Sequence, residues 1–142
     1  MKLEHVVRWT RYVAERLSRA FAGKQKRPDV FISAVTSDLG TVRKLVRDAL
    51  LDSDCFPVEQ SHFSPDYRKL EEMLRAKIGG CQAMIHMVGI RYGFEPNPAN
   101  RPPNTPRRSY TQMEYHMAKE LGLRCYTFVC PEDFPYDDGN HE

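Results

Sequence analysis

The chain has 142 residues, of which 41% are hydrophobic and 28% are charged, and its formal net charge is +2. This length supports one sizeable core, and the composition is ordinary for a globular protein, so we expect one domain with an appendage. The apolar runs are too short to span a bilayer, and residues 29–130 carry no broad excess of Lys and Arg. We therefore expect neither a membrane nor a nucleic acid as a partner.

The first 28 residues form a separate unit in the sequence. Apolar residues recur at helical spacing over residues 2–22, which predicts an amphipathic helix followed by a basic linker. Residues 1–28 hold eight Lys and Arg against two Glu. Arginines interrupt the continuous apolar segment that a secretory signal requires, so we expect a cytoplasmic protein.

From Asp29 onward, β-prone runs alternate with amphipathic helices. The predicted strands are 30–34, 55–59, 83–88 and 125–130. A helix is predicted after each of the first three strands. The residues expected to cap these helices are Thr36-Ser37-Asp38, Ser64-Pro65-Asp66 and, as a capping box, Ser109 to Gln112.

Two stretches depart from this alternation. Residues 94–108 contain five prolines and are predicted to be a long loop with no helix or strand. Residues 131–142 contain five acids and no Lys or Arg, which is typical of an acidic tail or the start of a linker. The predicted organisation is a helix and linker over 1–28, an α/β domain over 29–130 and an acidic end over 131–142.

The alternation predicts a parallel sheet with helices on both faces. Pro57 cannot donate to a strand ladder, which favours an edge position for the second strand, whereas the continuously apolar third strand suits the interior. A flavodoxin-like strand order of 2-1-3-4 satisfies both. In such a sheet, ligands bind beyond the carboxyl ends of the first and third strands.

Glu114 is the most unusual residue of the helix that starts near Tyr110. At 100° per residue it lies about 40° from Tyr110, within a stripe of apolar residues. A carboxylate in this position has either a partner or an altered pKa, as working acids and bases do. The alternatives are that Glu114 pairs with an arginine or turns to solvent at the start of the helix.

Other polar residues follow the strands at the same end of the sheet. They are Ser33 to Asp38, Gln60 to Phe63 and Gly89 to Gly93. Ser37 and Asp38 are interpreted as turn and capping residues. A surface ion pair for Arg91 and core packing for Tyr92 are at least as expected as ligand contact, and His86 is interpreted as a hydrogen-bonded core histidine.

Motifs for metals and phosphates are missing from the sequence. The four cysteines and five histidines are widely dispersed, without the spacing of metal ligands, so we expect no metal. The glycines form neither of the common phosphate-binding patterns. These features disfavour dinucleotide dehydrogenases and P-loop NTPases.

Five motifs occur in register with the predicted elements. They are Asp29-Val30-Phe31-Ile32-Ser33, Asp38-Leu39, Gly80-Cys81, Gly89-Ile90-Arg91-Tyr92-Gly93 and Ser109-Tyr110-Thr111-Gln112-Met113-Glu114-Tyr115. Together they resemble the TIR (Toll/interleukin-1 receptor) superfamily, particularly its prokaryotic branch of N-terminal effector domains on larger multidomain proteins. The resemblance covers residues 29 to 130. TIR domains usually finish with a fifth strand and helix, so we expect a fragment or a shortened variant.

The resemblance implies an activity for Glu114. Enzymatic TIR domains use a glutamate at this position to cleave the bond between nicotinamide and ribose in NAD. Nicotinamide leaves a cationic ring as a neutral base and needs no proton donor, so one acid suffices. NAD is then a substrate, and no cofactor is expected.

The resemblance also implies partners and a context. Self-association through TIR contacts, including the loop Gln60 to Ser64, is expected to complete the site in a prokaryotic anti-phage or similar immune response. The expected nucleotide-binding residues are Ser33, His62, Phe63, Arg91, Tyr92 and Tyr110. Two alternatives remain: an enzyme resembling nucleoside deoxyribosyltransferases, and a non-catalytic TIR-like interaction module.

Overall fold

A computed structural model describes residues 2–23, 27–60 and 66–137. Its strands are β1 Asp29–Ser33, β2 Phe56–Val58, β3 Ala83–Val88 and β4 Arg124–Val129. They form a four-stranded sheet in the order β2-β1-β3-β4, in which every neighbouring pair is parallel. The predicted flavodoxin-like strand order is therefore confirmed.

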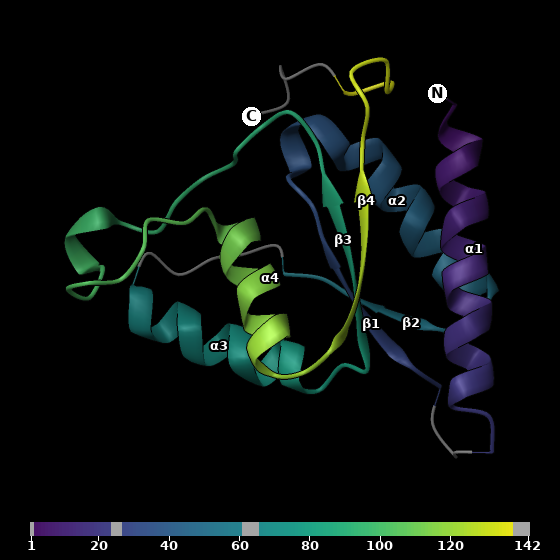
Figure 1. The fold of residues 1–142 in the computed structure, drawn as a ribbon, viewed down its shortest axis with the longest axis horizontal. Helices are drawn as coiled ribbons and strands as arrows, with labels where there is room; N and C mark the ends of the chain where they lie inside the picture. Colours follow the sequence, from purple (N-terminus) through teal and green to yellow (C-terminus); the bar gives the residue numbers. More distant parts are fainter. Residues whose placement is uncertain (1, 24–26, 61–65, 138–142) are drawn as a thin grey trace.

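Helices cover both faces of this sheet (Figure 1). One face carries α1 Leu3–Ala20 and α2 Thr36–Asp52, and the other carries α3 Tyr67–Gly79 and α4 Tyr110–Glu120. Side chains of a strand alternate between faces. Val30 and Ile32 accordingly join the core under α1 and α2, whereas Phe31 packs with α3 and α4. Residues at odd and even positions of β1 thus face different cores.

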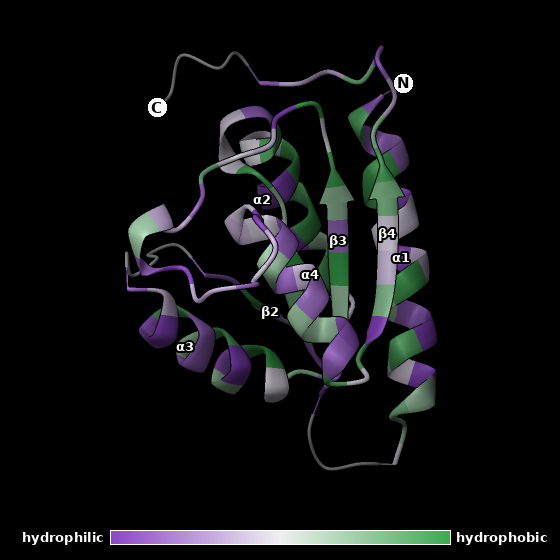
Figure 2. Ribbon diagram, turned by 60° about the vertical axis from the view of Figure 1, so that its left-hand side comes forward, coloured by the Kyte–Doolittle hydropathy of each residue, from purple (hydrophilic) through white to green (hydrophobic). Residues whose placement is uncertain are grey.

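The amphipathic N-terminal helix is confirmed, and it is part of the core. Val6, Val13 and Leu17 of α1 are buried in the same cluster as Val30 of β1. Apolar and polar residues alternate along α1 in Figure 2. The apolar stripe of this helix therefore completes one face of the domain.

The predicted capping residues agree with the structure at some helix starts and differ from it at others. The capping box at Ser109 is confirmed, because Ser109 and Gln112 exchange hydrogen bonds between side chain and backbone. The predicted side-chain cap of α2 is wrong: Val35 occupies the N-cap position and provides no side-chain bond. At α3 the cap is Asp66, whose carboxylate accepts two backbone N–H groups, while Ser64 lies outside the described residues.

The proline-rich loop contains one turn of 3₁₀ helix, η1 Pro98–Asn100, so the prediction that no helix forms there is wrong. The Asn97 side chain caps this turn by accepting from the backbone of Ala99 at 3.0 Å. Farther along, Arg107 Nε donates to both carboxylate oxygens of Glu95, at 2.8 and 2.9 Å. Short local contacts thus shape the loop.

Residues 131–137 pack back on the domain. Phe134 is buried in the α1 and α2 core, and Tyr136 donates to the carbonyl of Pro131 at 2.9 Å. Asp137 Oδ2 accepts from the backbone N–H of Thr41 at 2.7 Å, at the start of α2. This part of the acidic segment therefore contributes to the folded structure.

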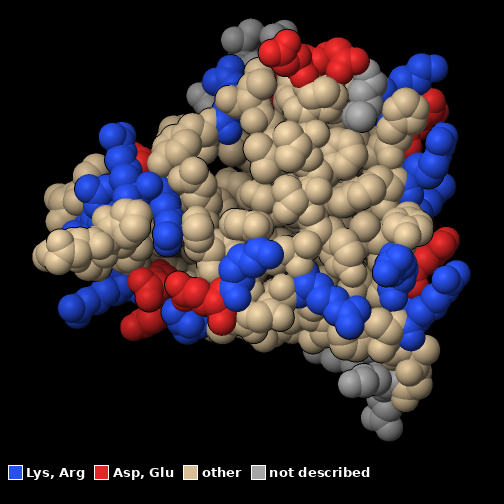
Figure 3. All heavy atoms as spheres, viewed as in Figure 1, with Lys and Arg blue, Asp and Glu red and all other residues tan. Residues whose placement is uncertain are grey.

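Charged side chains are unevenly placed on the face drawn in Figure 3, where Lys and Arg gather over α1 and over the proline-rich loop, with a largely uncharged region between them. The helices in the described part of the chain all lack the combination of length and apolar character needed to traverse a membrane.

Candidate active site

Ser33, His86 and Glu114 meet on the face of the sheet covered by α4. Ser33 is the last residue of β1, and His86 is its direct partner on β3. Both side chains point to the same face as Phe31 and Met84, because each lies two residues further along its strand. Glu114 reaches this point from α4. The site therefore lies near the carboxyl end of β1, as the predicted topology requires.

Glu114 is buried, with 2% of its surface exposed. Ser33 Oγ lies at hydrogen-bond distance, 2.9 Å, from Glu114 Oε1, and the hydroxyl donates to that oxygen when the carboxyl is ionised. Oε2 is also buried and has no hydrogen-bond partner among the described residues. The placement within the apolar stripe is therefore confirmed. The two alternatives, an arginine ion pair and a turn toward solvent, are wrong for the described part of the chain.

Burial sets the protonation of Glu114. It raises the pKa of this carboxyl to about 8, against the opposing effects of the Ser33 hydrogen bond and of the positive charges of Arg43 and Lys77. Arg43 is itself held by Glu59 at 2.6 Å, and Lys77 donates to Gln60 at 3.0 Å. Glu114 therefore holds a proton at neutral pH in the free protein.

His86 lies on the other side of the serine. Its Nδ1 is 3.3 Å from Ser33 Oγ, and its ring stacks on Tyr115 with centroids 4.7 Å apart. Burial, together with the charge of His116, lowers the pKa of His86 to about 4. The interpretation as a hydrogen-bonded core histidine is confirmed. Its hydrogen bond, however, connects it to Glu114 through Ser33.

Asp38 has a role that differs from the predicted one. Its Oδ2 accepts from the backbone N–H groups of Ile90 and Arg91, both at 3.0 Å. The predicted capping role is therefore wrong, because the carboxylate turns away from its own helix toward the loop that follows β3. A Cβ atom added at Gly89 would lie 2.5 Å from this oxygen. Asp38 and Gly89 together fix the start of the loop.

The remaining predicted ligand-binding residues are dispersed around Glu114. Tyr110 lies one turn earlier on α4 and is partly buried in the α3 and α4 core. Arg91 is exposed, and Tyr92 is 47% exposed and donates to Glu95 at 2.9 Å, so core packing of Tyr92 is wrong. None of these three hydrogen-bonds Glu114 within the described residues. His62 and Phe63 lie outside the described residues.

Sequence reasoning gave His86 and Asp38 structural roles only and did not name Arg43, although all three lie at or beside the site. His86 was detectable in principle, because it has the same strand parity as the core residue Met84. Asp38 was among the polar residues expected after the first strand, but nothing in the sequence joined its carboxylate to the loop after β3, and Arg43 gave no signal. Arg43 of α2 donates to Glu59, just after β2, and to the carbonyl of Ala34, just after β1. Contacts of that kind depend on the tertiary fold.

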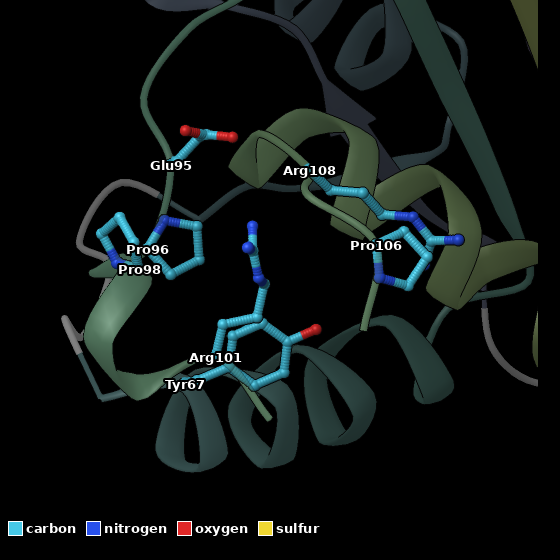
Figure 4. A pocket seen from close by; sticks show the side chains of 7 residues that line it. All are labelled: Tyr67, Glu95, Pro96, Pro98, Arg101, Pro106 and Arg108. Carbon is cyan, nitrogen blue, oxygen red and sulfur yellow. The ribbon is translucent and has the colours of Figure 1, made fainter. Parts of the chain in front are cut away.

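A separate small cavity lies between α3 and the proline-rich loop (Figure 4). Its volume is about 10 Å³, which is roughly the space for one water molecule. The lining residues are Tyr67, Glu95, Pro96, Pro98, Arg101, Pro106 and Arg108. Pockets for small molecules typically measure several hundred cubic ångströms, on the order of 300 Å³ or more. This cavity is therefore too small for a nucleotide.

The described residues contain no group of three or more His, Cys, Asp or Glu arranged to hold a metal ion. The side chains that meet at this site offer a carboxyl group, a hydroxyl and an imidazole. Such a set can exchange protons and can stabilise a positive charge next to the carboxylate.

No curated protein and no solved structure matches the chain. A family model described as "Domain of unknown function (DUF4062)" matches residues 29–137. The matched range starts with β1, contains Ser33, His86 and Glu114, and ends at Asp137, which bonds to the start of α2. The chain belongs to the DUF4062 family.

Proposed function

We propose that this chain is a TIR-like effector domain that cleaves the bond between nicotinamide and ribose in NAD, with Glu114 as the catalytic residue. The observation that carries the proposal is the state of the Glu114 carboxyl. It is buried at the switch point of a flavodoxin-like sheet, with one oxygen on Ser33 and the other without a partner among the described residues. Such a group is costly to retain without a ligand.

The chemistry of NAD suits a lone buried carboxyl. The nicotinamide ring is cationic before the bond breaks, and the ribose carries the positive charge afterwards. Either charge close to Glu114 favours its ionised form and lowers its pKa. Glu114 therefore loses its proton when the substrate binds. The carboxylate then stabilises the oxocarbenium ion or attacks it, while Oε2 accepts a hydrogen bond from a ribose hydroxyl.

Burial also supports a dependence on self-association. Glu114 is 2% exposed in the single chain, so a substrate needs a rearrangement to reach it. In the proposal, contacts between copies of the domain supply that rearrangement, and the loop from Gln60 to Ser64 takes part. Gln60 is buried and accepts a hydrogen bond from Lys77 of α3, which links the start of this loop to the helix layer over the site. The proposed context is prokaryotic anti-phage defence.

The test is nicotinamide release from NAD by the full chain, held in an oligomer by a fused assembly domain. We expect release by the parent and at least about a 100-fold loss in Glu114→Gln, as when a charge-stabilising group is removed. Glu120→Gln is the matched control, because Glu120 lies exposed at the end of the same helix, and it should retain activity.

The other outcomes separate the rival functions. Equal release by the parent and Glu114→Gln, or no release by a folded oligomer, would overturn the proposal. Cleavage of deoxynucleosides in place of NAD would indicate an enzyme resembling nucleoside deoxyribosyltransferases. Binding of a protein partner without any cleavage would indicate an interaction module.

A further inference from the structure

One hydroxyl group lies between Glu114 and His86. Ser33 Oγ is 2.9 Å from Glu114 Oε1 and 3.3 Å from His86 Nδ1. A serine hydroxyl has a single hydrogen and can donate only one of these bonds at a time. The other neighbour must then donate to the serine oxygen or lose its bond. The protonation of Glu114 and the tautomer of His86 are therefore linked through Ser33.

We propose that Ser33 is a proton switch, in which ionisation of Glu114 reverses both of its hydrogen bonds and changes the tautomer of His86. Ser33 and His86 are then positioning residues that act on the carboxyl. Their catalytic significance rests on the proposed cleavage of NAD, whereas the switch itself follows from the three side chains alone.

The protonated state has one consistent arrangement. A proton on Glu114 Oε2 would have no acceptor among the described residues, because that oxygen is buried without a partner. On Oε1 the proton is donated to Ser33 Oγ. The serine then donates its own hydrogen to His86 Nδ1, which must be the unprotonated nitrogen, so His86 carries its hydrogen on Nε2.

The ionised state reverses this arrangement. Glu114 releases its proton to water, and the Ser33 hydroxyl turns to donate to Oε1. The serine oxygen now presents lone pairs to His86 Nδ1. His86 takes up a proton from water on Nδ1 and releases one from Nε2 to water, so the ring stays neutral and only the proton of Glu114 is lost from the site in total.

The charged groups nearest to the site take no part in this exchange. Arg43 of α2 is held by Glu59, and Lys77 of α3 donates to Gln60, so neither forms a bond to Glu114 within the described chain. On α4, Tyr115 stacks on His86, and the charge of His116 works against protonation of the His86 ring. His86 is therefore neutral throughout the range in which Glu114 titrates.

Nitrogen-15 NMR of the histidine rings in the full chain tests the switch. We expect the His86 tautomer to change from the Nε2–H form to the Nδ1–H form over about pH 6 to 9.5, with a midpoint near the pKa of Glu114, about 8. The signals are assigned by their loss in His86→Gln. The titration of Glu114 is followed separately by its carboxyl carbon.

Two variants distinguish the proposed switch from a site in which burial shifts the pKa of Glu114 without any effect on His86. In Glu114→Gln the His86 tautomer should be constant across the range. In Ser33→Ala, Glu114 should still titrate, at higher pH because a hydrogen bond that favours its ionised form is gone, while the His86 tautomer should no longer follow it.

A constant His86 tautomer in the parent, while Glu114 titrates, would overturn the switch. An unchanged tautomer transition in either variant would do the same. Neither measurement uses NAD, so failure of NAD cleavage and failure of the switch are distinguishable. If cleavage is found, Ser33→Ala should also move the rising limb of kcat/KM to higher pH, which a purely structural serine would not do.

Discussion

Ser33 and Glu114 are 81 positions apart in sequence, yet the Ser33 hydroxyl lies 2.9 Å from the Glu114 carboxylate. This hydrogen bond favours the ionised form of Glu114, whereas burial favours the protonated form and prevails, since it raises the pKa to about 8. A protein that buries a carboxyl in this way loses stability when the group must ionise. The site should therefore be visible in the pH dependence of folding.

Glu114→Gln should stabilise the protein at neutral and alkaline pH. In the unfolded chain the carboxyl ionises near its ordinary value of 4.5, but in the folded protein only near about 8. The stability that the parent has below about pH 4.5 is therefore lost progressively as the pH rises to about 8, and the loss then levels off. The variant avoids a loss of roughly 3 kcal/mol at about pH 7 and roughly 5 kcal/mol above about pH 8.

Urea denaturation of both proteins between about pH 3.5 and 9 measures this difference. The two stability curves should converge at the acid end, where the carboxyl is protonated in both folded and unfolded parent. Glu120→Gln is the control. Glu120 is exposed, so this variant should show the same pH dependence of stability as the parent. Parallel curves for the parent and Glu114→Gln would contradict a raised pKa.

On the proposed function, binding of NAD should release a proton from Glu114. With a pKa of about 8, roughly nine in ten folded molecules hold this proton at about pH 7. A cationic nicotinamide ring beside the carboxyl favours its ionised form, so we expect a release approaching one proton per NAD bound.

Calorimetric titration of the chain fused to an assembly domain, in two buffers with different ionisation enthalpies, counts the protons released. A non-hydrolysable NAD analogue that retains the cationic ring keeps the measurement to binding alone. Glu114→Gln should bind without release. Release of equal size from this variant would show that the proton comes from another group.

The strand order and the burial of Glu114 were predictable because each depends on a local pattern. Pro57 lacks the N–H that an interior strand needs, and it lies in edge strand β2. Helical spacing alone placed Glu114 among apolar residues. Both features follow from one element and its neighbours in the sequence.

The connection between Ser33 and His86 was not predictable in the same way. It depends on the register of β1 against β3, which pairs these two residues and is set by contacts between distant segments. For Asp38, local propensity favoured a cap. The N–H groups of Ile90 and Arg91 compete for the same carboxylate from more than 50 positions away, and they prevail.

Gly89→Ala should destabilise the protein by about 1 to 3 kcal/mol, because the added methyl group would overlap Asp38 Oδ2 at 2.5 Å in a closely packed site. Gly79→Ala is the matched control. Its methyl group would meet Leu121 at an ordinary 3.8 Å at the end of α3, where alanine is the better helix former. We expect that variant to match or exceed the parent in urea.

A double-mutant cycle with Asp38→Ala checks the cause. If the overlap with the Asp38 carboxylate is responsible, the cost of Gly89→Ala should shrink markedly once that carboxylate is removed. An unchanged cost in the Asp38→Ala background would instead attribute the effect to Leu39, whose Cδ1 would lie 3.2 Å from the added atom.

Leu17→Ala should destabilise the whole domain by about 2 to 5 kcal/mol, although Leu17 precedes the family match at residues 29–137. Leu17 is fully buried in the cluster that contains Val30 and Val46. Tyr12→Ala on the same helix is the control, because Tyr12 is 56% exposed, and its cost should stay within about 0.5 kcal/mol. Both are measured by urea denaturation followed by circular dichroism. A small effect of Leu17→Ala in one cooperative transition would mean that α1 is dispensable, whereas a large effect would show that the sheet of this domain uses α1 as one of its layers.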